Sequence, residues 1–412
     1  MRVRRFARTM GSVFRYVRGR FDRSNSPTYS FLSGDTNNAN RCSDFSNSFN
    51  RLSLYRGLLA QHVPPLLCLF LTCLIATQPP SAWIGTCVLT TILITLLLFA
   101  LVYFIESFFT FAPNIPDRSR FFTELPQFPT WRVVRLIAPP MGSGCNVTLK
   151  CFLILQEDPS KRAAAPTILF LHGNAGNIGH RLPIARLLYD VCGANILLLE
   201  YRGFGYSNGQ PNEYGIYSDA KVAFDYLASG ADGDVDGRNI FIFGRSLGGA
   251  VAIDLSTRPG VATHARGTII ENTFSSIGGM SQTLSRNVIG PLGKYCIPTA
   301  LIHNRFESLK KLKTRNLDEG TKFLFISGAK DDLVPPVMMM QLASAWAANT
   351  RRSQDPETPW IFEGAQDFLH RGREGIVRLA EGNHATTWMC DGYGDVVKRF
   401  VLLHGLSGSK PT

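Results

Sequence analysis

The residues best suited to chemistry are a serine, an aspartate and a histidine that each follow an apolar run of strand length. The serine lies in Gly244-Arg245-Ser246-Leu247-Gly248, directly after the apolar run 239–243 and before a segment of helical length. This G-x-S-x-G spacing between a strand and a helix is typical of a sharp turn that exposes the serine Oγ. We interpret Ser246 as a nucleophile, and Gly244 and Gly248 as positions where a side chain would collide with neighbouring backbone.

A serine nucleophile requires backbone donors for the oxyanion that its attack creates. The helix that follows Ser246 predicts the amide of Leu247 as the first donor. The loop His172-Gly173-Asn174-Ala175-Gly176-Asn177 closes an earlier apolar run. It favours the amide of Asn174 as the second donor, with Ala175 as the alternative. His172 precedes the serine, whereas the partners follow it in this kind of site, so we expect His172 to brace the loop.

The acid is expected after the apolar run 322–327, where Asp331 and Asp332 are adjacent. A carboxylate at that place holds the imidazole in one tautomer and stabilises its charged form. Asp331 lies three residues before Val334, which is the usual spacing of this loop, and it is therefore preferred over Asp332.

The base is expected after one further strand, predicted at 376–379. Three histidines follow the acid, namely His370, His384 and His404. His370 lies in a polar segment and His404 in a predicted final helix, whereas His384 lies in the turn after the strand. We predict that Ser246, Asp331 and His384 form a catalytic triad.

Alternation of strands and helices predicts the elements that position these residues. Apolar strands that alternate with helices indicate a largely parallel sheet, buried on both faces. Together with the G-x-S-x-G turn and the order serine, aspartate, histidine, this predicts an α/β-hydrolase fold. About fifty residues between Asn272 and Thr321 leave room for a small helical lid at about 275–320. The predicted strands are 131–138, 147–155, 167–171, 195–200, 239–243, 267–271 and 322–327. The predicted helices are 179–191, 218–228, 247–256 and 337–348.

A membrane region at 58–112 is predicted ahead of the hydrolase domain at 113–412. Residues 83–105 carry no charge over 23 positions, and about 20 apolar residues cross a bilayer. This predicts one transmembrane helix. The stretch 57–76 is a possible second span, although Pro64 and Pro65 weaken it. One span and two spans place the enzyme on opposite sides of the membrane.

The net charge of +12 is concentrated in the N-terminal tail, because residues 1–57 contain eleven Arg, no Lys and three Asp. A basic tail apart from the folded domain favours a membrane-surface or targeting role over nucleic-acid binding. The tail is expected to be largely disordered. The predicted location is a membrane, the endoplasmic reticulum before the plasma membrane, with mitochondrial import as the alternative. The nine cysteines show no metal-ligand spacing, and no metal or cofactor is expected.

Several segments resemble the bud-emergence-46-like family of α/β-hydrolases. They are HGNAGNIGHRLP (172–183), YRGFG (201–205), FGRSLGGAVAI (243–253), ENTF (271–274), DLVPPVMMMQL (332–342) and HATTW (384–388). The resemblance covers roughly residues 113–402 and implies a membrane serine hydrolase with its triad on Ser246, Asp331 and His384. Two departures adjoin the histidine. Ala385-Thr386 stands where the family has Asn-Asp, and 352–374 is an insertion.

Three functions are compatible with these residues. The first is an acyl hydrolase that cleaves a lipid or acyl-protein ester or thioester at a membrane, through an acyl-enzyme. The second is a membrane scaffold with a vestigial site, which an intact triad disfavours. The third is a membrane serine peptidase. Lys310, Lys311, Lys313 and Arg315 form either a basic lid edge for acidic head groups or an ordinary solvated surface.

Overall fold

Short runs of Ile, Leu and Phe form the centre of a β-sheet, because such side chains pack well on both faces of a pleated surface. The computed structural model describes residues 83–406, apart from 143, 262–263, 291–298, 300–301, 316, 318–319 and 355–358. The described residues form a nine-stranded sheet of order β1-β2-β4-β3-β5-β6-β7-β9-β8. Only the pairings β1–β2 and β2–β4 are antiparallel. The strands are β1 (Thr130–Ala138), β2 (Val147–Leu155), β3 (Thr167–Leu171), β4 (Asn195–Leu199), β5 (Ile240–Arg245), β6 (Ala265–Glu271), β7 (Phe323–Gly328), β8 (Ile361–Glu363) and β9 (Gly375–Leu379).

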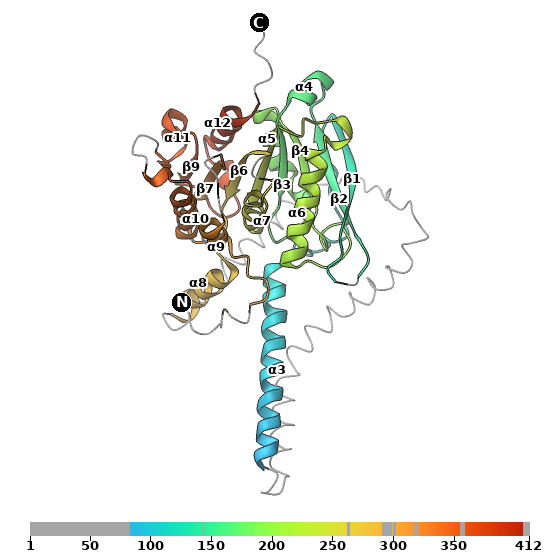
Figure 1. Cartoon of the computed structure of the whole chain (residues 1–412), viewed down its shortest axis with the longest axis vertical. Coiled ribbons are helices and arrows are strands. Elements are labelled where there is room, and N and C mark those ends of the chain that lie inside the picture. Colours follow the sequence, from blue (N-terminus) through green and yellow to red (C-terminus); the bar gives the residue numbers. More distant parts are fainter. Residues whose placement is uncertain are drawn as a thin grey trace. The chain divides into compact units, whose positions relative to one another are not determined.

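Helices cover both faces of the sheet and enclose two separate apolar cores (Figure 1). One core contains side chains of α6 (Glu213–Ala228), α7 (Leu247–Ser256), α9 (Ser308–Thr314) and α10 (Pro336–Asn349). The other contains side chains of α5 (Leu182–Cys192), α11 (Ala365–Arg371) and α12 (Tyr393–His404). The remaining described α-helices are α3 (Trp83–Thr110), α4 (Pro159–Ala164) and α8 (Ile277–Ile289). This is the α/β-hydrolase architecture that the alternating pattern predicts.

The insertion at 352–374 differs from expectation because it extends the sheet. Its segment Ile361–Glu363 forms β8, which pairs in parallel with β9, and α11 follows directly. Phe362 and Phe368 are fully buried and their rings pack edge to face at 5.1 Å. Although the insertion is largely polar in composition, these two phenylalanines fix it to the apolar core.

The predicted lid is described only in part, as α8 and α9. Two of the cations assigned to a basic lid edge are engaged internally. Lys311 Nζ lies 3.1 Å, and Arg315 Nη2 2.9 Å, from Asp254 Oδ1 on α7. Neither alternative, a basic lid edge or a solvated surface, describes these two residues, because they join α9 to α7 through Asp254.

The N-terminal region is described from α3 onward. Residues 83–102 belong to one unit of the structure and residues 103–406 to another. No helix in the described part of the chain is both long and apolar enough for a membrane crossing. The predicted span at 83–105 lies within α3, whereas the tail at 1–57 and the possible span at 57–76 lie outside the described residues.

Candidate active site

The turn between β5 and α7 presents Ser246 at the carboxyl edge of the sheet. Ser246 has φ 54° and ψ −121°, a strained backbone conformation for a residue with a side chain. Gly248 allows close approach of the turn to β3, and Gly244 allows close approach of β5 to α7. A Cβ at Gly248 would lie 1.9 Å from the Leu171 carbonyl oxygen, and one at Gly244 would lie 2.3 Å from the Gly248 oxygen. Neither position accommodates a side chain. Since α7 begins at Leu247, directly after Ser246, the N-terminal amides of this helix lie close to Ser246.

His384 lies between Ser246 and Asp331. Its Nε2 is 3.1 Å from Ser246 Oγ, and its Nδ1 is 2.8 Å from Asp331 Oδ2. The loop that follows Asp331 holds its side chain in place, since Oδ1 accepts from the amides of Leu333 (3.0 Å) and Val334 (2.8 Å). Val334 is the residue whose spacing from Asp331 suggested this aspartate as the acid. The carboxylate side chain is only 2% exposed. The three residues predicted from separate strand ends therefore lie in one hydrogen-bonded row.

The neighbouring candidates lie elsewhere. Asp332 is exposed to solvent. His370 is on α11, and His404 on α12 directs its Nε2 to the Arg373 carbonyl oxygen at 3.2 Å. Among the described residues, no group of three or more His, Cys, Asp or Glu side chains is arranged to hold a metal ion.

Asn272, at the carboxyl end of β6, links the loops that carry the acid and the histidine. It is 1% exposed with φ 45°, a conformation that asparagine tolerates better than most residues. Its Oδ1 accepts from the Gly328 amide at 2.8 Å, and its Nδ2 donates to Asn383 O at 3.2 Å and Thr387 Oγ1 at 2.9 Å. One amide group therefore sets the spacing between the end of β7 and the turn of His384.

Arg245 also supports the histidine turn. Its Nη2 donates to the carbonyl oxygen of His384 at 2.5 Å, and its Nε lies 3.2 Å from Glu271 Oε1. Glu271 is fully buried and its Oε2 accepts from the Tyr393 hydroxyl at 2.6 Å. Burial, with the nearby charge of Glu271, raises the pKa of Tyr393 well above its usual value. The hydroxyl therefore remains a donor to Glu271.

The histidine turn has its own internal bonds despite its departure from the family sequence. Asn383 Oδ1 accepts from the amides of Ala385 (2.8 Å) and Thr386 (2.9 Å). These bonds use backbone atoms of both residues, so the altered side chains leave the turn formed.

The loop after β3 reaches Ser246 through Gly173, where a Cβ would lie 3.5 Å from Ser246 Cβ. His172 is fully buried, with Nδ1 2.7 Å from Gly173 O and Nε2 3.3 Å from Glu200 Oε1. His172 is thus buried at the start of the loop, in a position from which it can support the loop. Arg181 donates to the Ala175 carbonyl oxygen. Burial, together with the charge of Arg245, lowers the pKa of Arg181 to about 10, and the guanidinium stays charged at neutral pH.

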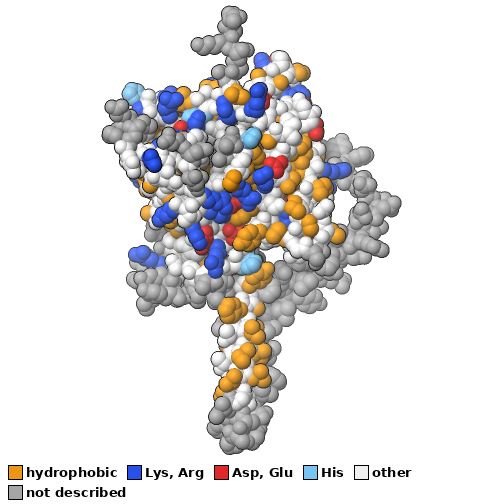
Figure 2. All heavy atoms as spheres, viewed as in Figure 1, with side chains coloured by type: hydrophobic (Ala, Val, Ile, Leu, Met, Phe, Trp, Pro, Cys, Tyr) orange, Lys and Arg blue, Asp and Glu red, His pale blue; other side chains and the backbone are white. Residues whose placement is uncertain are grey.

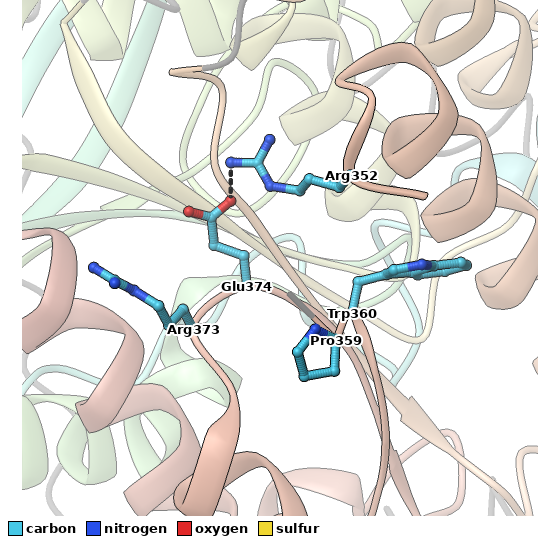
Figure 3. A pocket seen from close by; sticks show the side chains of 5 residues that line it. All are labelled: Arg352, Pro359, Trp360, Arg373 and Glu374. Atoms are coloured by element: carbon cyan, nitrogen blue, oxygen red, sulfur yellow. Dashed lines mark ion pairs between the residues drawn. The ribbon is translucent and has the colours of Figure 1, made fainter. Parts of the chain in front are cut away.

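A pocket of about 230 Å³ lies apart from these residues. It is lined by Arg352, Pro359, Trp360, Arg373 and Glu374, which are drawn in Figure 3. Arg352 Nη2 and Glu374 Oε2 form an ion pair at 2.5 Å within it. None of Ser246, Asp331 or His384 lines this pocket, so it adds nothing to their chemistry.

Comparison with known proteins places the chain in a family. The model of the alpha/beta hydrolase family matches residues 168–409. The chain belongs to that family. Within it the chain is similar to Protein bem46 of Schizosaccharomyces pombe, with 38% identity over 198 residues, which are 48% of this chain and 61% of that protein. The Arabidopsis thaliana alpha/beta hydrolase domain-containing protein WAV2 is 37% identical over 47% of this chain and 62% of its own length.

Other similarities are more distant. An uncharacterized membrane protein of Saccharomyces cerevisiae is 30% identical over 60% of this chain and 75% of its own length. A solved esterase of Pyrococcus furiosus superposes with a TM-score of 0.47 and 15% identity, over 68% of this chain and 91% of the esterase. The chain thus matches about three fifths of the length of Protein bem46 and of WAV2.

Proposed function

We propose that this hydrolase is a serine hydrolase that cleaves carboxylic esters or thioesters of amphiphilic acyl groups. The observation that carries the proposal is the row of hydrogen bonds from Ser246 Oγ through His384 to Asp331, at 3.1 and 2.8 Å. Nucleophile, base and acid in this order are the arrangement that acyl transfer to a serine requires.

The reaction proceeds through an acyl-enzyme. Ser246 Oγ attacks the carbonyl carbon while His384 Nε2 takes the hydroxyl proton, and Asp331 stabilises the imidazolium. The oxyanion is bound by the amide of Leu247 and by that of Asn174 or Ala175. His384 then protonates the departing alcohol or thiol, and the acyl group remains on Ser246. A water molecule, deprotonated by His384, attacks the acyl-enzyme; His384 then returns the proton to Ser246 Oγ as the carboxylic acid is released.

Attachment to a membrane forms part of the proposal. Several large apolar side chains of α3 are exposed, among them Val88, Leu89, Ile92, Leu96 and Phe99, which are 49–63% exposed. On the face shown in Figure 2 the described side chains of α3 are hydrophobic or uncharged. A contiguous apolar surface of this kind is characteristic of membrane or protein contact. One of the relatives is itself described as a membrane protein.

A fluorophosphonate probe tests the nucleophile. The full-length wild type should be labelled, and Ser246→Ala should not be, because the variant lacks the attacking oxygen. Loss of the serine typically lowers turnover about a million-fold. Ser256→Ala is the control, since that serine is buried and lies at the far end of α7. Equal labelling of wild type and Ser246→Ala would contradict the assignment.

A scaffold with a vestigial site would show no labelling in either. A panel of acyl esters, thioesters and peptides then distinguishes acyl hydrolysis from proteolysis.

A further inference from the structure

A segment that precedes the matched family region is bonded to the loop expected to bind the oxyanion. Residues 111–124, here termed the strap, follow α3 and belong to no helix or named strand. The Ala112 amide donates to the Asn174 carbonyl oxygen at 2.8 Å, and Ala112 forms an isolated parallel bridge with Ala175. The strap therefore contacts the two residues that are the alternatives for the second oxyanion donor.

The bond from Ala112 fixes a peptide plane of that loop. In a trans peptide the carbonyl of one residue and the amide of the next point in opposite directions within one rigid plane. Holding the Asn174 carbonyl therefore also sets the direction of the Ala175 amide. The neighbouring Asn174 amide is constrained through the shared Cα.

Asn177 provides the second attachment. This residue is 1% exposed, and its Nδ2 donates to the carbonyl oxygens of Ser119 and Phe122, both at 2.7 Å. The contact is tight, because a Cβ at Gly179 would lie 2.6 Å from the Glu124 amide nitrogen. An asparagine that gives both amide hydrogens to backbone carbonyls has a geometric role that few residues can replace.

The strap is fixed at its other side as well. Arg120 Nη1 donates to the carbonyl oxygens of Gly205 (2.5 Å) and Ser207 (2.7 Å), and Tyr206 donates to Phe121 O at 2.9 Å. At its start, the Phe111 ring packs edge to face on Phe306 at 6.1 Å. Since the strap is anchored to the rest of the unit, it can hold the oxyanion loop in place.

We infer that the strap is a positioning element of the oxyanion hole, which acts through Ala112 and Asn177, and that the catalytic unit therefore begins well before residue 168. This inference rests on the proposed function. Small displacements of oxyanion donors matter, since loss of one donor lowers kcat by roughly 10² to 10³. Because the strap acts one step away, its release should cost about ten- to hundredfold in kcat, with KM little changed.

The test compares two full-length variants with a matched control, on a p-nitrophenyl acyl ester. Asn177→Asp replaces the two donors with an acceptor facing two carbonyls, and Ala112→Pro removes the amide that Asn174 accepts from. Asn349→Asp is the control, because Asn349 Nδ2 also donates to two backbone carbonyls, at 2.6 and 2.9 Å. Asn349 ends α10, about 20 Å along that helix from the acid loop.

Three readouts separate positioning from mere loss of folded protein. The value of kcat is divided by the number of sites titrated with fluorophosphonate, KM is measured alongside, and the inhibition constant is determined for an alkyl trifluoromethyl ketone, which forms a tetrahedral adduct. Both strap variants should show at least a tenfold lower kcat per titrated site, KM within about twofold, and a weakened inhibition constant of similar factor.

Wild-type kcat per titrated site in both strap variants would overturn the inference. An equal loss in Asn349→Asp, or a change confined to KM, would do the same. If instead the wild type neither turns over nor is labelled at Ser246, the proposed function itself fails, and this outcome is distinct from the others.

Discussion

Asp331 and Asp332 are adjacent carboxylates with different surroundings. Asp331 is buried, accepts two amides and lies 2.8 Å from His384 Nδ1, whereas Asp332 is exposed. Asp331→Asn should lower kcat roughly 10⁴-fold, because it removes the charge and the tautomer control that a triad acid provides. Asp332→Asn should leave kcat within about twofold. Steady-state kinetics on one acyl ester decides between them, and a larger effect at position 332 would refute the assignment of the acid.

The sequence alone brought together Ser246, Asp331 and His384, which form one hydrogen-bonded row in the structure, because each follows a strand and has a recognisable local spacing. It was not sufficient for Asn272 or Arg245. The partners of Asn272 are 56, 111 and 115 residues away, and no local pattern marks an asparagine for contacts at that range. Arg245 occupies a position of the G-x-S-x-G motif where any residue is allowed, so its bond to the His384 carbonyl became evident only in three dimensions.

At the scale of elements, α9 and α7 are joined by buried charges. Asp254 on α7 is 2% exposed and pairs with Arg258, Lys311 and Arg315. Burial alone would raise the pKa of Asp254, but the three cations outweigh it and lower the pKa below its ordinary value. The carboxylate is therefore charged in the folded protein at all but acid pH.

Asp254→Asn should lower the free energy of unfolding by about 3 kcal/mol, because it leaves neighbouring cations without their partner. The folded-state pKa lies below that of the unfolded chain, so the stabilisation is present above about pH 4 and is lost as the pH falls further. Denaturant unfolding of wild type and variant at several pH values measures this difference. Asp190→Asn, at an exposed pair with Arg186, should cost under about 1 kcal/mol. Equal effects at the two positions would contradict the argument.

Element boundaries show where local patterns mislead. Helix α6 begins at Glu213, five residues before its predicted start, because Asn212 caps it by accepting the Gly215 amide. Gly215 disfavours a helix on propensity. Here a side chain is excluded, since a Cβ would lie 2.6 Å from Arg202 Cδ. Arg202 is itself held by Asp219 at 2.7 Å. Tertiary contact thus overrides local preference. The strand β8 was not predicted because it is only three residues long and lies within a polar insertion.

At the scale of the whole molecule, membrane attachment through α3 makes a direct prediction. In the double variant Leu89→Asp and Leu96→Asp, two exposed apolar residues are replaced on α3, where they are 63% and 60% exposed. Each aspartate places a charge on this apolar surface, and a charge is costly to remove from water on contact with lipid. The variant should shift from the membrane pellet to the supernatant after carbonate extraction, whereas the wild type stays in the pellet.

The control for this experiment is Leu402→Asp on α12, where the leucine is 64% exposed. It should remain in the pellet with the wild type. Release of Leu402→Asp, or release of the unaltered chain, would refute attachment through α3. Folding of each variant is checked by fluorophosphonate labelling at Ser246.

The short strand β8 has a consequence for how copies of the protein meet. The last strand of a sheet presents unpaired amides and carbonyls on which a second molecule can add a strand. Without the insertion, that position would fall to β9, which is five residues long and almost entirely buried. Instead the edge is a three-residue strand that carries Glu363, paired with Arg378 at 2.7 Å, and its Glu363 amide donates to Asp367 at 3.1 Å. At this edge of the sheet, few free backbone groups therefore remain to pair with a strand of a second molecule.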